Sequence, residues 1–136
     1  MRYSIYQLIP QREPFLFVDE LVSAEEQICT TKYQVKHSDI FIDKGKLLEA
    51  GVIEHMAQSA SVLAGFKALE SGIENPPLGM IGEIKSFSIH RLPALEDTLE
   101  SRVSFGLSVG NITVASVETF VSGNLIAEAI FKISID

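Results

Sequence analysis

The stretch Leu47–Leu69, which reads LLEAGVIEHMAQSASVLAGFKAL, decides the fold. It contains no proline and is rich in leucine, alanine, methionine, glutamate and glutamine, so it predicts one helix of about six turns. Apolar and small residues point in every direction around this helix, which indicates a helix surrounded by protein on all sides. Ser71-Gly72 is a helix stop, and Asn75-Pro76-Pro77 would prevent continuation.

After the helix, apolar and polar residues alternate, which is the pattern of a strand with one buried face. Three alternating runs follow, separated by the turn signals Gly110-Asn111 and Ser122-Gly123-Asn124. They predict an antiparallel meander whose inward faces are Leu99, Ser101, Val103, Phe105, Leu107 and Val109; Thr113, Ala115, Val117, Thr119 and Val121; and Ala127, Ala129, Phe131, Ile133 and Ile135.

Other segments add strands to this meander. Gly82 to His90 and Ile28 to Val35 predict two strands, and Phe15 to Val18 predicts a short extended segment. One apolar helix with five or six strands indicates an α+β fold in which an antiparallel sheet wraps around the helix. Residues 1–136 would form one domain, and pairing of an open edge strand predicts a homodimer.

Composition excludes several classes of function. The net charge of -7, with no basic cluster, argues against nucleic acid as a partner. The predicted helix carries Glu49, Glu54 and Lys67, which are costly in a bilayer, so we expect no membrane span. The lone Cys29, together with an N-terminus unlike a secretion signal, indicates a reducing cytoplasm. The three histidines and the single cysteine do not show the close spacing of metal ligands, so we expect no metal site. We also expect no cofactor.

Three segments carry a family resemblance. They are Leu8–Asp19 (LIPQREPFLFVD), Ile53–Ala60 (IEHMAQSA), and Ile84–Pro93 (IKSFSIHRLP) followed by Asp97-Thr98-Leu99. They resemble LIPHRxPFLxVD, LEAMAQAA and xxARFxRPVxPGDxL of the 3-hydroxyacyl-acyl carrier protein dehydratases. The resemblance implies a HotDog fold, a dimer with shared tunnels, and an acyl thioester substrate on acyl carrier protein or coenzyme A.

The chain departs from that family at the loop before the helix. There the family has a catalytic histidine in GHFPGxPxxPG, whereas Asp43–Glu49 reads DKGKLLE. The family's glycine whose backbone N–H polarises the thioester carbonyl falls on Glu49, which still has an amide. The chain is similar in this respect to dehydratase-like proteins of aryl-polyene pathways, which keep the helix motif and lack the histidine loop.

The chemistry points to one helix carboxylate. Dehydration of a 3-hydroxyacyl thioester needs a base, an acid and carbonyl polarisation. The resemblance assigns a catalytic carboxylate to Glu54, which we expect to be buried beside a cavity for an acyl-pantetheine chain. Gln58 and Ser61 lie on the same helix stripe, where they would orient Glu54 or line the tunnel, although a structural role fits Gln58 equally well. His55 points about 100° away from Glu54, so core or interface packing explains it better.

His37 and His90 are the remaining candidates for the missing base or for substrate binding. His37 lies in a loop and His90 at a strand end, where an exposed side chain is the commoner explanation. Three hypotheses remain. The first is a dehydratase-type protein that binds an acyl-pantetheine thioester, in fatty-acid or polyene type metabolism. The second is a thioesterase that uses one helix carboxylate, and the third is a non-catalytic scaffold that pairs with an active dehydratase paralogue or only holds an acyl ligand.

Overall fold

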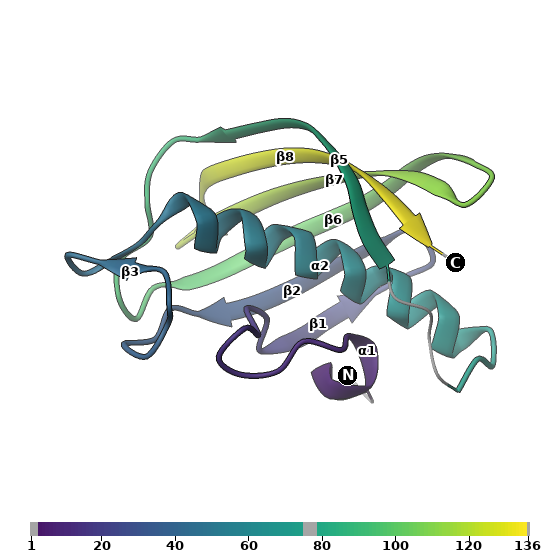
Figure 1. Ribbon diagram of the computed structural model, residues 1–136, viewed down its shortest axis with the longest axis horizontal. Helices are drawn as coiled ribbons and strands as arrows, with labels where there is room; N and C mark the ends of the chain where they lie inside the picture. The colour runs from purple at the N-terminus through teal and green to yellow at the C-terminus, as the bar shows by residue number, and fades with distance from the viewer. Residues whose placement is uncertain (1–2, 75–78, 136) are drawn as a thin grey trace.

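The computed structural model describes residues 3–74 and 79–135 and shows one long helix held in a curved sheet (Figure 1). In chain order the elements are α1 Ile5–Leu8, β1 Glu20–Ala24, β2 Ile28–Gln34, β3 Ile42–Asp43, β4 Lys46–Leu47, α2 Glu49–Glu70, β5 Gly79–Ile89, β6 Thr98–Val109, β7 Ile112–Val121 and β8 Asn124–Ile135.

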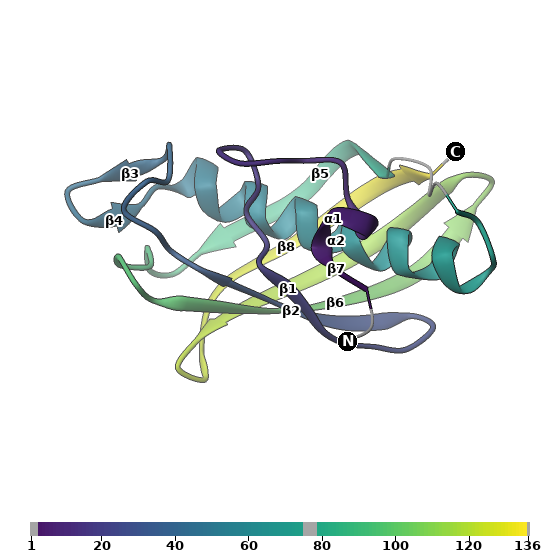
Figure 2. The same ribbon diagram turned by 90° about the horizontal axis from the view of Figure 1, so that it is seen from below.

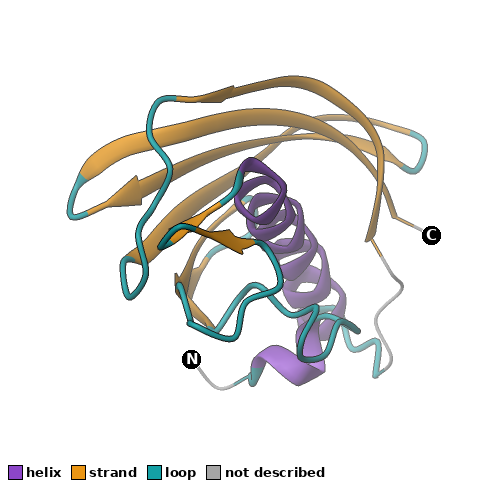
Figure 3. Cartoon of the chain, turned by 60° about the vertical axis from the view of Figure 1, so that its left-hand side comes forward, coloured by secondary structure: helices purple, strands orange, loops and turns teal. Residues whose placement is uncertain are grey.

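The main sheet has six antiparallel strands in the order β1-β2-β6-β7-β8-β5. It curves around α2, while α1 and the N-terminal loop lie on the helix's other side (Figures 2 and 3). The edge strands are β1 and β5. The predicted α+β class, with an antiparallel sheet wrapped around one central helix, is confirmed.

Helix α2 begins two residues later than the sequence predicts. Leu47 pairs with Ile42 in the small β3–β4 hairpin, and its N–H donates to the Pro93 carbonyl at 2.9 Å. Leu48 is the N-cap in an extended conformation, with its N–H bonded to the Phe41 carbonyl. Both backbone groups therefore have partners outside the helix. The predicted stop is confirmed, because Gly72 follows α2 with φ +88°. Asn75-Pro76-Pro77 lies outside the described residues.

The predicted enclosure of α2 holds for one half of the helix. All side chains from Gln58 to Phe66 are buried. The first turns differ, since Glu49, Ala50 and Glu54 are exposed and Ile53 is half-buried. Complete enclosure was therefore wrong for the single chain, because the sheet and the N-terminal loop leave this face of the first turns uncovered.

The predicted inward face of β6 is correct only as far as Phe105. The register against β7 shifts between Phe105 and Ser108, so the alternation is displaced and Ser108 pairs with the buried Thr113. Leu107 and Val109 are consequently 74% and 70% exposed, and their predicted burial was wrong. An irregularity of this kind displaces the alternation beyond it, and here neither face is covered there, since Gly106 to Val109 are all exposed.

Strand β1, which the sequence did not predict, forms one edge of the sheet. A register shift between Leu21 and Ser23 breaks its alternation and hides the strand signal. The predicted segment Phe15–Val18 joins neither sheet. The tight turn at Gly110-Asn111 is confirmed, since Val109 and Ile112 pair across it.

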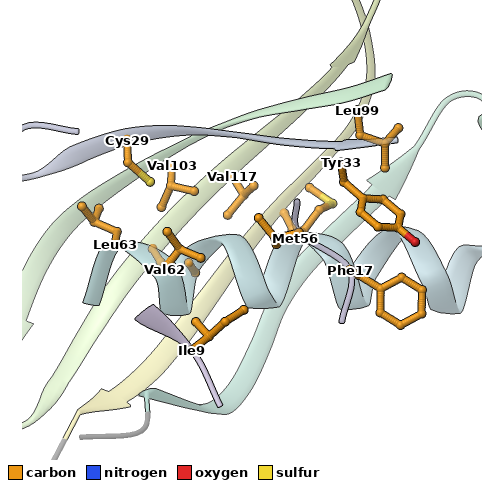
Figure 4. Close-up of a cluster of buried hydrophobic side chains, with 14 of the residues drawn as sticks. Ile9, Phe17, Cys29, Tyr33, Met56, Val62, Leu63, Leu99, Val103 and Val117 are labelled. Carbon is orange, nitrogen blue, oxygen red and sulfur yellow. The ribbon is translucent and has the colours of Figure 1, made fainter. Parts of the chain in front are cut away.

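The core lies between α2 and the inner face of the sheet. Figure 4 shows Met56, Val62 and Leu63 of the helix among side chains from the strands, including Val103 and Val117. Alternating strand residues and the helix residues that face them thus exclude water together. Among the described helices, none combines the length and apolar character needed to cross a membrane.

Gly65 lets α1 approach α2 closely. A Cβ atom at this position would lie 2.2 Å from the Leu8 carbonyl oxygen, which is backbone and cannot rotate away. We expect Gly65→Ala to lower the free energy of unfolding by about 2 kcal/mol, despite the better helix propensity of alanine. Urea denaturation would measure this loss.

Gly51→Ala is the matched control in the same helix, because there the new Cβ would meet mainly the movable side chain of Leu47. A loss for Gly65→Ala no larger than that for Gly51→Ala would contradict the predicted clash.

Candidate active site

Glu54 lies on the second turn of α2, on the face that the single chain leaves open. Its side chain is exposed. The expected burial of Glu54 was therefore wrong for one chain, and the cavity expected beside it stays a prediction. The carboxylate has a fixed neighbour, since Gln58 Nε2 donates to Glu54 Oε2 at 2.9 Å.

Gln58 is buried and holds three groups at once. Its Oε1 accepts from the Phe17 N–H at 2.7 Å, and its Nε2 donates to the Phe15 carbonyl at 2.8 Å as well as to Glu54. These partners fix which way the amide faces, because a carbonyl can only accept and an N–H can only donate. The amide therefore presents a donor to Glu54.

His55 lies in the core, so its predicted packing role is confirmed. Burial lowers the pKa of the imidazole to about 4, and the hydrogen bond to the Phe17 backbone and then the Asp19 charge offset this in part. The ring stacks against Tyr33, with 5.9 Å between centroids. Both ring nitrogens have partners at 2.7 Å, the Phe17 carbonyl at Nδ1 and Ser101 Oγ at Nε2. His55 is therefore neutral near pH 7. Its side chain is buried, whereas that of Glu54 is exposed to solvent.

The other two histidines lie at the surface. His37 is in the loop after β2, with its Nε2 3.5 Å from Glu96, and its side chain is 73% exposed. His90 follows β5, with its Nε2 3.2 Å from Glu128. The exposed position expected for His90 is confirmed. No described hydrogen bond or ion pair links either histidine to Glu54.

Ser61 and Glu49 lie on opposite sides of Glu54 along α2. Ser61 is buried, and its hydroxyl donates to the Gly79 carbonyl at 3.1 Å, which ties the helix to β5. Glu49 is the first residue of α2, so its N–H is among those that lack a partner within the helix. Their roles toward a substrate stay predictions.

A tight hairpin occupies the place of the family's histidine loop. Ile42–Asp43 pairs with Lys46–Leu47, and Lys44 and Gly45 both have positive φ, at 50° and 77°. Positive φ at both central residues is the backbone of a primed turn. The hairpin packs against the loop after β5, where the Leu95 N–H donates to the Gly45 carbonyl.

Sequence reasoning missed the part played by the backbone of Phe15 and Phe17. These residues supply a carbonyl and an N–H that orient Gln58. The family motif marks the segment without showing its contacts, which join residues about 40 positions apart. Among the described residues, no group of three or more histidine, cysteine, aspartate or glutamate side chains has the geometry of a metal site.

A curved antiparallel sheet around one long helix defines the HotDog class, and solved structures share it. The dehydratase heterocomplex ApeI:P from Xenorhabdus doucetiae matches with a TM-score of 0.89 over 100% of this chain and 93% of that chain, at 15% identity. A hypothetical thioesterase from Streptococcus pneumoniae, solved with coenzyme A, matches with a TM-score of 0.69 over 86% and 84%, at 14% identity. These likenesses establish the fold.

Sequence comparison gives the particular family. Residues 3–133 match the ApeP-like family, described as ApeP dehydratase. The 3-hydroxyacyl-[acyl-carrier-protein] dehydratase FabZ of Campylobacter curvus is 30% identical over 95% of this chain and 93% of that protein. FabZ of Campylobacter jejuni is 29% identical over 95% and 92%. The chain belongs to the ApeP-like dehydratase family, and the predicted resemblance is confirmed.

Proposed function

We propose that this dehydratase-like protein binds an acyl-pantetheine thioester at the open face of α2 and contributes Glu54 as the catalytic carboxylate. The observation that carries the proposal is the Gln58–Glu54 hydrogen bond, which fixes an exposed carboxylate at the edge of an apolar core. Ile53 and Ala57 flank it and are half-buried, which suits a fatty acyl chain. The thioester is carried by acyl carrier protein or coenzyme A.

The site needs a second subunit. Dehydration removes a proton beside the thioester carbonyl and expels the 3-hydroxyl, so a base and an acid act together. Glu54 assists departure of the hydroxyl, and the Glu49 N–H polarises the carbonyl. The hairpin Asp43–Leu47 contains no histidine, and the described contacts of His37, His55 and His90 are to groups other than Glu54.

The partner subunit would therefore supply the base. We propose pairing along the edge strand β5, where Met80 and Ile84 are 59% and 51% exposed, in a homodimer or with a histidine-bearing dehydratase paralogue. The likeness to the dehydratase heterocomplex ApeI:P supports the second arrangement. The buried free thiol of Cys29 supports a reducing, cytoplasmic location, and the family supports a place in fatty-acid or polyene type metabolism.

Thioester hydrolysis is the second candidate. A single carboxylate can activate water without a histidine, and Glu54 is both exposed and oriented. The released product would then be a free thiol and an acid.

One experiment separates these functions. The purified protein, alone and mixed with a histidine-bearing dehydratase paralogue, is incubated with a 3-hydroxyacyl-pantetheine thioester and with the matching simple acyl thioester. If a paralogue supplies the base, enoyl thioester forms in the mixture and not with the protein alone; if the second copy of a homodimer supplies it, enoyl thioester also forms with the protein alone. Thiol release by the protein alone would favour hydrolysis, and binding without either reaction in both samples would favour a scaffold.

Light scattering on the same samples gives the assembly state. We expect a dimer, and a monomer at micromolar concentration in both samples would contradict the proposed edge pairing.

A further inference from the structure

We propose that His55 is a positioning residue for Glu54, which acts through the backbone of Phe17 and the side-chain amide of Gln58. The inference rests on the proposed function and adds the means by which the carboxylate is held. The His55 side chain lies in the core, and its ring nitrogens bond to Phe17 and Ser101 instead of to the Glu54 carboxylate, so its influence has to pass through other groups.

The direction of each hydrogen bond around His55 is determined. A backbone carbonyl can only accept, so the contact of 2.7 Å between Nδ1 and the Phe17 carbonyl places the ring proton on Nδ1. Nε2 then accepts from Ser101 Oγ at 2.7 Å, and Ser101 in turn accepts from Thr119 Oγ1 at 2.7 Å. His55, Ser101 and Thr119 are all fully buried. The tautomer is therefore set by the Phe17 carbonyl, and the two hydroxyls on the sheet side orient to match it.

Two side chains of α2 hydrogen-bond to the backbone of Phe17, one to its carbonyl and one to its N–H. Its carbonyl accepts from His55, and its N–H donates to Gln58 Oε1 at 2.7 Å. Positions 55 and 58 lie three residues apart on one helix face, so both reach the same residue of an extended segment. The Phe17 ring stacks on Phe41 with 5.6 Å between centroids. Phe17 belongs to no strand of the main sheet, so these contacts fix its position.

The position of Phe17 influences which end of the Gln58 amide, its NH2 group or its oxygen, is directed at Glu54. With Oε1 held by the Phe17 N–H, Nε2 faces the Phe15 carbonyl and the Glu54 carboxylate. If Phe17 moved away, Gln58 Oε1 would lose its donor, and only the Phe15 carbonyl and Glu54 itself would hold the amide in this orientation. The bond from His55 to Phe17 thus adds to the contacts that keep the donor of Gln58 directed at the carboxylate.

Two substitutions separate this role from simple packing. Asparagine at position 55 places an N–H near the location of Nδ1, whereas glutamine places its amide near that of Nε2. His55→Asn therefore keeps the hydrogen bond to the Phe17 carbonyl and loses the one to Ser101. His55→Gln keeps the hydrogen bond to Ser101 and loses the one to the Phe17 carbonyl. His55→Ala removes both. All three variants leave space in the core, so a purely structural role predicts similar losses for asparagine and glutamine.

The first readout is the side-chain amide of Gln58, observed by NMR in the full-length protein. We expect its resonances and slow hydrogen exchange to survive in His55→Asn, and its exchange to become about tenfold faster or more in His55→Gln. Equal behaviour of the two variants, with both folded, would overturn the inference whether or not the protein turns over substrate.

The second readout is turnover of the assembled protein. We expect kcat to fall about tenfold in His55→Gln with KM unchanged, and to be restored to within about twofold of the wild type in His55→Asn. If Glu54→Gln abolished turnover while both His55 variants kept kcat equally, the positioning role would fail and the proposed function would stand. If the amide behaved as expected while Glu54→Gln kept full turnover, the positioning chain would stand and the catalytic role of Glu54 would fail.

Discussion

Glu54→Gln should lower turnover of the 3-hydroxyacyl thioester by about a hundredfold or more, because it removes the ionisable proton and keeps the shape of the side chain. Gln58 can still donate to the new amide oxygen, so the local hydrogen bond is preserved. Glu54 is exposed and outside the core, and folding should therefore survive the change. Steady-state kinetics with the 3-hydroxyacyl thioester, run with the protein alone and mixed with the histidine-bearing paralogue, checks the first statement, and a denaturation curve for each protein checks the second.

The matched control is Glu26→Gln, which removes the same charge from an exposed side chain in the turn between β1 and β2. This variant should keep the wild-type rate. A Glu54→Gln protein with the same activity as Glu26→Gln would contradict the catalytic assignment. If the wild type, both alone and in the mixture, binds acyl-pantetheine and catalyses neither dehydration nor hydrolysis, and Glu54→Gln binds equally well, the chain is a scaffold.

A loss of stability on mild acidification is the second large expected effect. His55 titrates near 6.5 in an unfolded chain, and burial lowers its pKa to about 4 in the fold. The unfolded state therefore binds the proton first, so stability from this group is complete above pH 6.5 and falls as the pH drops toward 4. The difference in pKa corresponds to about 3 kcal/mol across that interval.

Urea denaturation at several values between pH 7.5 and 4.5 measures this dependence. Carboxylates also titrate at the lower end, so the useful quantity is the difference between the wild type and His55→Asn, which cannot take up this proton. The difference between the free energies of unfolding of the two proteins should become smaller as the pH falls. A constant difference would show that His55 is not the titrating group. The neighbours Phe17, Tyr33, Ser101 and Thr119 are neutral, which leaves Asp19 as the charge that moderates the effect.

Local sequence patterns predicted the elements whose periodicity is regular. The apolar stretch 47–69 gave the helix to within two residues, because no proline interrupts it and most of its side chains face protein. The alternation after Leu99 predicted β6, β7 and β8 because strands bury every second side chain. The motif IEHMAQSA indicated the family and singled out Glu54 and Gln58.

The tertiary structure decided what each of those residues touches. Register shifts hid β1 and exposed the end of β6, and such shifts come from strand pairing, which a single segment does not encode. The exposure of Glu54 depends on which face of α2 the rest of the chain leaves open. The bonds from His55 and Gln58 to Phe17 join residues 38 and 41 positions apart. Periodicity reports the local backbone and the buried face of a segment, whereas contacts at such separations exist only after the chain has packed.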